Sequence, residues 1–283
     1  MVNLNEYIKE GLFDNIDKLE GKNGLESNAK QLKKDIIDWI CSNYYNQPNG
    51  YKSHLVKKRD LQINMETIPP TVNYDAKNSL ENRLFASNNI TSLNNNGMFQ
   101  WGTVTKDFIC SNSKIETLEG SPKEVGGRFY CDSCKNLISL EGAPEKVNWF
   151  SCSRCDNLTS LKGVPKEVEM YFNCIKCKSL KSLKGAPEKV GRDFVCAYCS
   201  SLTSLKGAPK EVGGDFICSD CYDLKSLEGA PEEVSGSFNC SDCYNLKSLE
   251  GAPKEVGEDF CCDSKFTEDD VKQVSKVKGK IDC

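Results

Sequence analysis

Histidine is almost absent from this chain of 283 residues, since His54 is the only one. A mechanism that needs a histidine base or a histidine-rich metal site would therefore have to use that residue. Signature motifs of catalysis and phosphate binding are missing too: the sequence has no GxSxG, HExxH, Walker A or dinucleotide-binding GxGxxG pattern. We therefore expect no enzymatic activity and no cofactor, and we assign no catalytic residues.

Long apolar runs and a strong charge imbalance are also lacking. No stretch of about 18 apolar residues occurs, so we expect no membrane span. The first ten residues, MVNLNEYIKE, lack the apolar centre of a secretory signal. With 37 basic against 41 acidic residues, nothing favours nucleic acid or an anionic membrane as a partner. These features predict a cytoplasmic protein.

Cysteine, by contrast, is abundant: the chain has 17, an odd number that cannot pair completely within one molecule. Most of them belong to a repeat. Aligning the chain on Phe-x-Cys gives eight copies, 21 or 22 residues apart, with their cysteines at Cys110, Cys131, Cys152, Cys174, Cys196, Cys218, Cys240 and Cys262. Near-constant spacing over eight copies predicts a stacked solenoid with about 22 residues per coil.

The repeat unit reads F-x-C-x-x-C-x-x-L-x-S-L-x-G-A-P-x-x-V. The Phe-x-Cys alternation is typical of a short strand, whereas the later steps of three indicate a chain that turns around an axis. Gly-x-Pro recurs seven times and predicts a corner, and we expect a second corner at pairs such as Gly213-Gly214. Each coil should then carry two short strands, around Leu-x-Ser-Leu and around Val-x-x-x-Phe-x-Cys.

The predicted fold is therefore a mainly β repeat solenoid with an α-helical N-terminal region and a short C-terminal capping helix. We divide the chain into a helical docking or capping region (1–50), degenerate first coils with an inserted loop at 94–97 (51–103), the eight-copy solenoid (104–266) and a C-terminal cap (267–283). The Phe-x-Cys pattern is expected to stop after Cys262. Thr267 is the expected N-cap of the final helix, from which Val271, Val274 and Val277 would cover the last coil.

Two helices are expected at the N-terminus. The first carries an apolar stripe of Leu4, Ile8, Leu12, Ile16 and Leu19, with Phe13 beside it, and should end at Gly21 and Gly24. The second should begin near Ser27. Both could pack on the first coil as a hairpin, or the first could dock into a groove of another protein.

The repeat resembles leucine-rich repeats, in particular the phenylalanine- and cysteine-containing class of bacterial and phage proteins. Leu137, Leu140, Pro144, Val147, Phe150 and Cys152 carry the match, although the gap from Phe to Cys is one residue shorter here. The resemblance implies a binding or structural protein. The segment LNEYIKEGLF also resembles the leader that addresses some tailed-phage proteins to the capsid, which a prohead protease cuts after an aliphatic-x-Glu, as at Glu10-Gly11.

Six copies carry CxxC, a spacing that also suits metal ligands. Two ladders of buried thiols are one interpretation, because cysteine is small and apolar. Zinc bound between stacked pairs is a second interpretation, and disulfides are a third. The cysteines concerned are Cys131, Cys134, Cys152, Cys155, Cys174, Cys177, Cys196, Cys199, Cys218, Cys221, Cys240 and Cys243. We favour the ladders and assign no metal site.

The expected function is non-enzymatic protein binding or a structural role, in a phage-encoded protein of the host cytoplasm or the virion. Its partner would be a capsid or other virion protein, or a host protein if the chain is an effector. The expected contact residues are Leu4, Ile8, Leu12, Phe13, Ile16, Trp149, Tyr171 and Tyr198. The exposed side of the Leu-x-Ser-Leu segments, at Thr159, Lys181, Thr203, Lys225 and Lys247, is a further candidate surface, whose serines we expect to cap turns.

Overall fold

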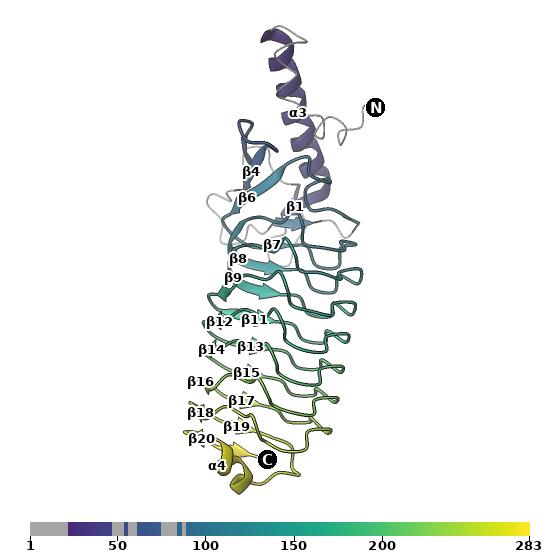
Figure 1. Ribbon diagram of the computed structural model, residues 1–283. Coiled ribbons are helices and arrows are strands. Elements are labelled where there is room, and N and C mark those ends of the chain that lie inside the picture. Colours follow the sequence, from purple (N-terminus) through teal and green to yellow (C-terminus); the bar gives the residue numbers. More distant parts are fainter. Residues whose placement is uncertain (1–21, 47–53, 56–60, 75–83, 87–88) are drawn as a thin grey trace.

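The phenylalanines of successive repeats stack on one another along the length of the molecule. From Phe108 to Phe260, neighbouring ring centroids are 5.2–5.6 Å apart. This stack is the centre of a β-solenoid in the computed structural model, which describes residues 22–46, 54–55, 61–74, 84–86 and 89–283 (Figure 1). The predicted fold class and the 22-residue coil are confirmed.

From residue 167 onward, each coil contributes one short strand to each of two sheets. The long sheet has 15 strands and the short sheet has six. Between repeats the strands pair in parallel and in register, so that Phe194 faces Phe216 in the long sheet and Val190 faces Val212 in the short one. A spacing of 22 residues therefore keeps each side chain above its counterpart.

The long sheet is made of β1 (Tyr44–Asn46), β2 (His54–Leu55), β3 (Leu61–Asn64), β4 (Thr71–Tyr74), β5 (Leu84–Ala86), β6 (Gln100–Val104), β7 (Phe108–Ile109), β8 (Glu124–Tyr130), β9 (Lys146–Ser151), β11 (Tyr171–Asn173), β13 (Phe194–Val195), β15 (Phe216–Ile217), β17 (Phe238–Asn239), β19 (Phe260–Cys261) and β21 (Ile281–Asp282). The short sheet is made of β10 (Glu167–Val168), β12 (Lys189–Val190), β14 (Glu211–Val212), β16 (Glu233–Val234), β18 (Glu255–Val256) and β20 (Lys276–Val277).

The steps of three in the repeat arise from turns closed between residues i and i+3. In the second copy, the amide of Leu137 donates to the carbonyl of Cys134, and the amide of Ala143 donates to that of Leu140. Each turn brings the third residue back to the interior, so Cys134, Leu137 and Leu140 are fully buried. The predicted strand at Leu-x-Ser-Leu is wrong: these segments form only the isolated bridge between Ser204 and Ser226 in the part of the chain that the structure describes, because the flanking turns leave them too short.

Both predicted corners are confirmed. The Gly-x-Pro glycines have φ values from +81° to +110°, in the left-handed region that glycine adopts without strain. The chain also bends at Gly213-Gly214, between β14 and β15. From residue 167 onward, such a bend divides the expected Val-x-x-x-Phe-x-Cys strand into two strands that belong to different sheets. β8 and β9 instead run through this segment as single strands, as predicted.

Helix α3 (Lys22–Asn43) stands at the N-terminal end of the stack (Figure 1). It begins five residues before Ser27 and includes Gly24, which we expected to lie between the two helices; Gly24 is in the first turn of α3. Ile36 and Ile40 are fully buried, and Trp39 packs edge-on against Phe99 with centroids 5.7 Å apart. The helix therefore covers the first coils, as predicted. The expected first helix, 4–19, lies outside the described residues.

The residues before the first repeat join the stack only in part. β3 and β4 form an antiparallel hairpin rather than a coil, and β4 then pairs in parallel with β6. β1 pairs with β5 antiparallel, and β5 pairs with β7 parallel. The degenerate region thus changes from antiparallel pairing to the parallel pairing of the repeats.

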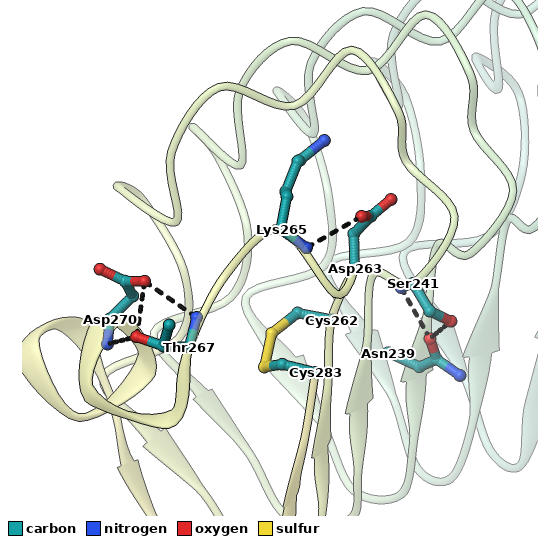
Figure 2. Close-up of a disulfide and its surroundings, with 8 residues drawn as sticks. All are labelled: Asn239, Ser241, Cys262, Asp263, Lys265, Thr267, Asp270 and Cys283. Atoms are coloured by element: carbon teal, nitrogen blue, oxygen red, sulfur yellow. Dashed lines mark hydrogen bonds between the residues drawn. A yellow bond between two sulfur atoms is a disulfide. The ribbon is translucent and has the colours of Figure 1, made fainter.

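The C-terminal helix α4 (Glu268–Val274) begins as predicted. Thr267 caps it through a reciprocal pair with Asp270, and Val271 is fully buried (Figure 2). The expectation that the pattern ends at Cys262 is wrong. Ile281 and Asp282 form β21 beside β19, because isoleucine can take the place of the stacked phenylalanine. Val277 lies in β20 instead of the helix.

Candidate protein-binding surfaces

The CxxC pairs form two buried ladders, as predicted. The first ladder runs through Cys110, Cys131, Cys152, Cys174, Cys196, Cys218, Cys240 and Cys262, and the second through Cys134, Cys155, Cys177, Cys199, Cys221 and Cys243. The residue before each second-ladder cysteine has a positive φ, as at Lys176 (+61°) and Asp220 (+57°). CxxC is therefore a turn whose two cysteines both point inward.

Thiols of the second ladder bond to the backbone of the preceding coil. Cys155 Sγ donates to the carbonyl of Cys131 and Cys221 Sγ to that of Cys196, at 3.2 and 3.3 Å, and the other members repeat this contact. Polar residues close the ladder at both ends. Ser113 Oγ lies 3.4 Å from Cys134 Sγ, and Lys265 Nζ donates to the carbonyl of Cys243.

Burial makes most of these thiols poor nucleophiles. Desolvation raises the pKa of Cys110, Cys196, Cys218 and Cys240 well above the ordinary thiol value, and it raises the pKa of Cys134 and Cys243 to about 11.

Cys199 is the exception, because a hydrogen bond with the Cys174 thiol lowers its pKa. The same bond raises the pKa of Cys174. Both side chains are fully buried, which leaves no access for a substrate.

Metal binding by the ladders finds no support in the arrangement of the side chains. Over 22–46, 54–55, 61–74, 84–86 and 89–283, no group of three or more His, Cys, Asp or Glu side chains is placed to hold a metal ion. Second-ladder thiols instead donate to carbonyl oxygens.

One bridge joins neighbouring members of the first ladder. Cys262 and Cys283 form a disulfide with their Cα atoms 4.6 Å apart, which is close to the distance between adjacent strands (Figure 2). It ties the last strand, β21, to the coil before it. The disulfide interpretation therefore holds for this pair, which the sequence did not identify because Cys283 was placed outside the repeat.

Most outward columns of the solenoid are lined by paired charges. Nine Lys–Glu or Lys–Asp pairs link neighbouring coils in the described part of the chain, for example Lys189–Glu211 at 2.8 Å and Lys206–Glu228 at 3.0 Å. Exposed pairs of this kind add little stability individually. They do balance the charge along the columns in which they occur.

An aromatic cluster interrupts this pattern on the long sheet. Arg128, Trp149 and Tyr171 are direct neighbours on β8, β9 and β11, at a position where later coils carry Asp193, Asp215, Ser237 and Asp259. The Trp149 and Tyr171 rings have centroids 4.1 Å apart, and the Arg128 guanidinium lies 4.4 Å from the Trp149 ring.

Met170 completes this cluster, because Trp149 Nε1 donates to its sulfur at 3.1 Å. We name Arg128, Trp149, Met170 and Tyr171 the sheet-face cluster. All four side chains are partly exposed. The structure thus brings together two of the predicted contact residues, Trp149 and Tyr171.

Tyr198 lies elsewhere, on the CxxC turns. We name these turns the turn edge; in each coil it comprises the five residues that follow the first-ladder cysteine. Tyr198, Tyr222 and Tyr244 are 42%, 43% and 63% exposed there, and the last two stack with centroids 5.6 Å apart. Tyr222 and Tyr244 were not predicted, although their spacing of 22 residues identifies them as one column.

The remaining predictions are tested in part. Ser160 and Ser226 accept hydrogen bonds from backbone amides two residues later, so they cap turns as expected. Lys181, Thr203 and Lys225 are exposed beside them. The predicted contact residues Leu4, Ile8, Leu12, Phe13 and Ile16 lie outside the described residues.

Comparison with known proteins found no match for this sequence among family models, curated proteins or solved structures. Within the described residues, neither helix is both long and apolar enough to cross a membrane.

Proposed function

We propose that this chain is a non-enzymatic repeat protein that binds another protein through the sheet-face cluster. The observation that carries the proposal is the packing of Trp149 between Arg128 and Tyr171 on an open sheet. Tryptophan, tyrosine, arginine and methionine are the residue types most enriched where proteins meet. Parallel strands hold these side chains in fixed register, so little conformational entropy is lost on binding.

The contrast with the later coils supports this role. At the corresponding position, Asp193 and Asp215 accept hydrogen bonds from backbone amides of the next coil. An aromatic side chain cannot accept such a bond, so Trp149 and Tyr171 do not serve the stack in this way. The coils that carry Trp149 and Tyr171 lack this hydrogen bond between coils and instead expose an apolar surface, which is expected of a binding site.

The origin and location of the protein belong to the same proposal. The resemblance to phage leucine-rich-repeat-like proteins and to a capsid-targeting leader favours a phage-encoded protein, acting in the host cytoplasm or in the virion. Its partner would be a capsid or other virion protein, with neither nucleic acid nor a membrane involved. An effector that binds a host protein would use the same surface.

Affinity capture with three forms of the chain tests the binding site. The wild type, a Trp149→Ala/Tyr171→Ala variant and a Lys225→Ala/Lys247→Ala control are immobilised and exposed to lysate of infected cells. We expect a protein that the wild type and the control retain and the aromatic variant loses. Retention of the same proteins by all three forms, with unchanged circular dichroism, would contradict the proposal.

Mass spectrometry of purified particles separates the two kinds of partner. Detection of the chain in particles in constant ratio to the capsid protein supports a virion component. Its restriction to the soluble lysate, together with capture of a host protein, identifies an effector.

A further inference from the structure

The two halves of the turn edge carry opposite charge. In the first four coils, it contains five basic residues against two acidic ones: Lys114, Lys135, Arg154, Lys176 and Lys178 against Asp132 and Asp156. In the last four coils, it contains four acidic residues against one basic one: Asp220, Asp223, Asp242 and Asp263 against Lys265. The chain as a whole is nearly neutral, so this separation is a local property of one edge.

The exposed tyrosines of the turn edge all belong to the acidic half. Tyr244 donates to Asp242 at 3.1 Å, and Tyr222 stacks on Tyr244. At the boundary between the halves, Lys176 Nζ lies 4.8 Å from the Tyr198 ring centroid. The molecule thus already pairs a basic side chain of one half with an aromatic side chain of the other, where the two halves meet.

From this arrangement we propose that two copies of the chain associate through their turn edges, antiparallel, about a two-fold axis near Lys176 and Tyr198. A two-fold axis places the basic half of each copy against the acidic, aromatic half of the other. Arg154 would then face the coil of Asp220 and Tyr222 in the second copy. Arginine and lysine contact both carboxylates and aromatic faces favourably.

A second copy fits this surface better than a foreign basic segment does. A basic partner would satisfy the acidic half alone and would be repelled by the basic half. Only a partner with the same two halves in reverse order satisfies both, and the chain itself has that order. The turn edge and the sheet-face cluster share no residue, so each can be altered without changing the other.

Residues of opposite charge can be exchanged at one turn position without a change in backbone conformation. Arg154, Lys176, Asp220 and Asp242 occupy the same turn position, with φ between +56° and +61°. Each residue type is therefore already accepted at that position in another coil. An acid-reversed variant carries Asp220→Lys/Asp242→Lys, and a base-reversed variant carries Arg154→Asp/Lys176→Asp.

Light scattering and sedimentation measure the association of the wild type and of both variants, alone and mixed, at protein concentrations up to roughly 0.1 mM. We expect twice the 31.5 kDa chain mass for the wild type. Each variant alone should dissociate at least about tenfold more readily, and more salt should weaken the wild-type dimer. An equimolar mixture of the two variants should form a dimer again.

A wild type that remains monomeric, or a dimer that neither variant weakens, would overturn the proposal. A monomeric wild type that binds a lysine-rich peptide would show instead that the acidic half serves a foreign partner. The Trp149→Ala/Tyr171→Ala variant should remain dimeric, so a failure of the sheet-face proposal and a failure of this one give different results.

Discussion

Gly207 lies directly against the backbone of Lys184 in the preceding coil. A β-carbon at Gly207 would stand 2.7 Å from both the Cα and the amide nitrogen of Lys184, and the φ of Gly207 is +89°. The corner therefore needs glycine for two separate reasons, its conformation and its lack of a side chain.

Gly97 allows the effect of conformation to be measured alone. It has the same φ of +89°, but a β-carbon there would meet no atom within 4 Å. We expect Gly97→Ala to lower the free energy of unfolding by about 1 kcal/mol, the usual cost of a left-handed alanine. Gly207→Ala should lower it by about 3 kcal/mol or more, since backbone must also move. Urea denaturation followed by circular dichroism measures both, and equal losses would contradict the account of the corner.

The two cysteine ladders should respond differently to serine. The Cys221 thiol donates to the carbonyl of Cys196, a bond that a serine hydroxyl can also make, and the first copy already carries serine, Ser113, at the same position. The buried Cys218 thiol donates no hydrogen bond within the described residues. We therefore expect a loss of about 1 kcal/mol for Cys221→Ser and about 2–3 kcal/mol for Cys218→Ser, in which a hydroxyl is buried without a partner. Thermal unfolding of the two variants side by side checks the order, and the reverse order would contradict it.

Asp132 should give the stability an unusual pH dependence. Burial raises the pKa of its carboxyl, although Ser151 Oγ and the Ser153 amide donate to it. The folded state thus holds this proton more tightly than the unfolded state does. The contribution of Asp132 is therefore most favourable below its unfolded pKa and is lost as the pH rises through its folded pKa. Relative to the wild type, Asp132→Asn should gain stability as the pH rises over that window, as measured by urea unfolding at several pH values.

Glu141 provides a control of opposite sign for this experiment. A hydrogen bond and ion pair with Lys162 lower the pKa of the Glu141 carboxyl, so its contribution is present above the unfolded pKa and is lost as the pH falls. The Glu141→Gln variant should therefore differ from the wild type least at acidic pH. If the stability of both variants relative to the wild type changed in the same direction as the pH rises, the two pKa assignments would be contradicted.

The disulfide should stabilise only the C-terminal end. Cys262 and Cys283 are 21 residues apart, and closing a loop of that size contributes about 3 kcal/mol in the chain-entropy model. We expect Cys283→Ser to speed amide exchange in β21 and to leave the central coils unchanged. Reducing agent should bring the wild type to the same behaviour, whereas Cys261→Ser, which leaves the bridge intact, should have little effect. Faster exchange throughout the molecule would argue against a local role.

The repeat could be predicted because its signal is local and recurs eight times. The register from Cys110 to Cys262 is enough to indicate the coil, its inward residues and its Gly-x-Pro corner. The assignment of strands failed at Leu-x-Ser-Leu because apolar spacing reports which residues are buried and not whether the backbone pairs. Cys283 was missed for a related reason: Ile281 replaces the phenylalanine that defined the pattern.

The candidate surfaces were less predictable than the core. Trp149 and Tyr171 stood out as departures from the repeat, but their stacking depends on which strands are neighbours. Tyr222 and Tyr244 were overlooked because each follows a cysteine and looked like part of the regular unit. The charge separation on the turn edge depends on the coil, because the solenoid stacks residues 22 positions apart into one column.

The hydrogen bonds between coils run in both directions along the solenoid. Amides such as that of Cys196 donate forward to the next coil, whereas amides such as that of Gly213 donate back to the previous one. The backbone N–H and C=O groups on one side of a repeat coil consequently match those on the facing side of another repeat coil. Duplication or deletion of one 22-residue unit would therefore preserve the hydrogen bonds between coils, so the length of this protein can change in whole coils during evolution. Each added or lost coil would move Trp149 or the charge boundary by one strand spacing relative to the two ends of the solenoid.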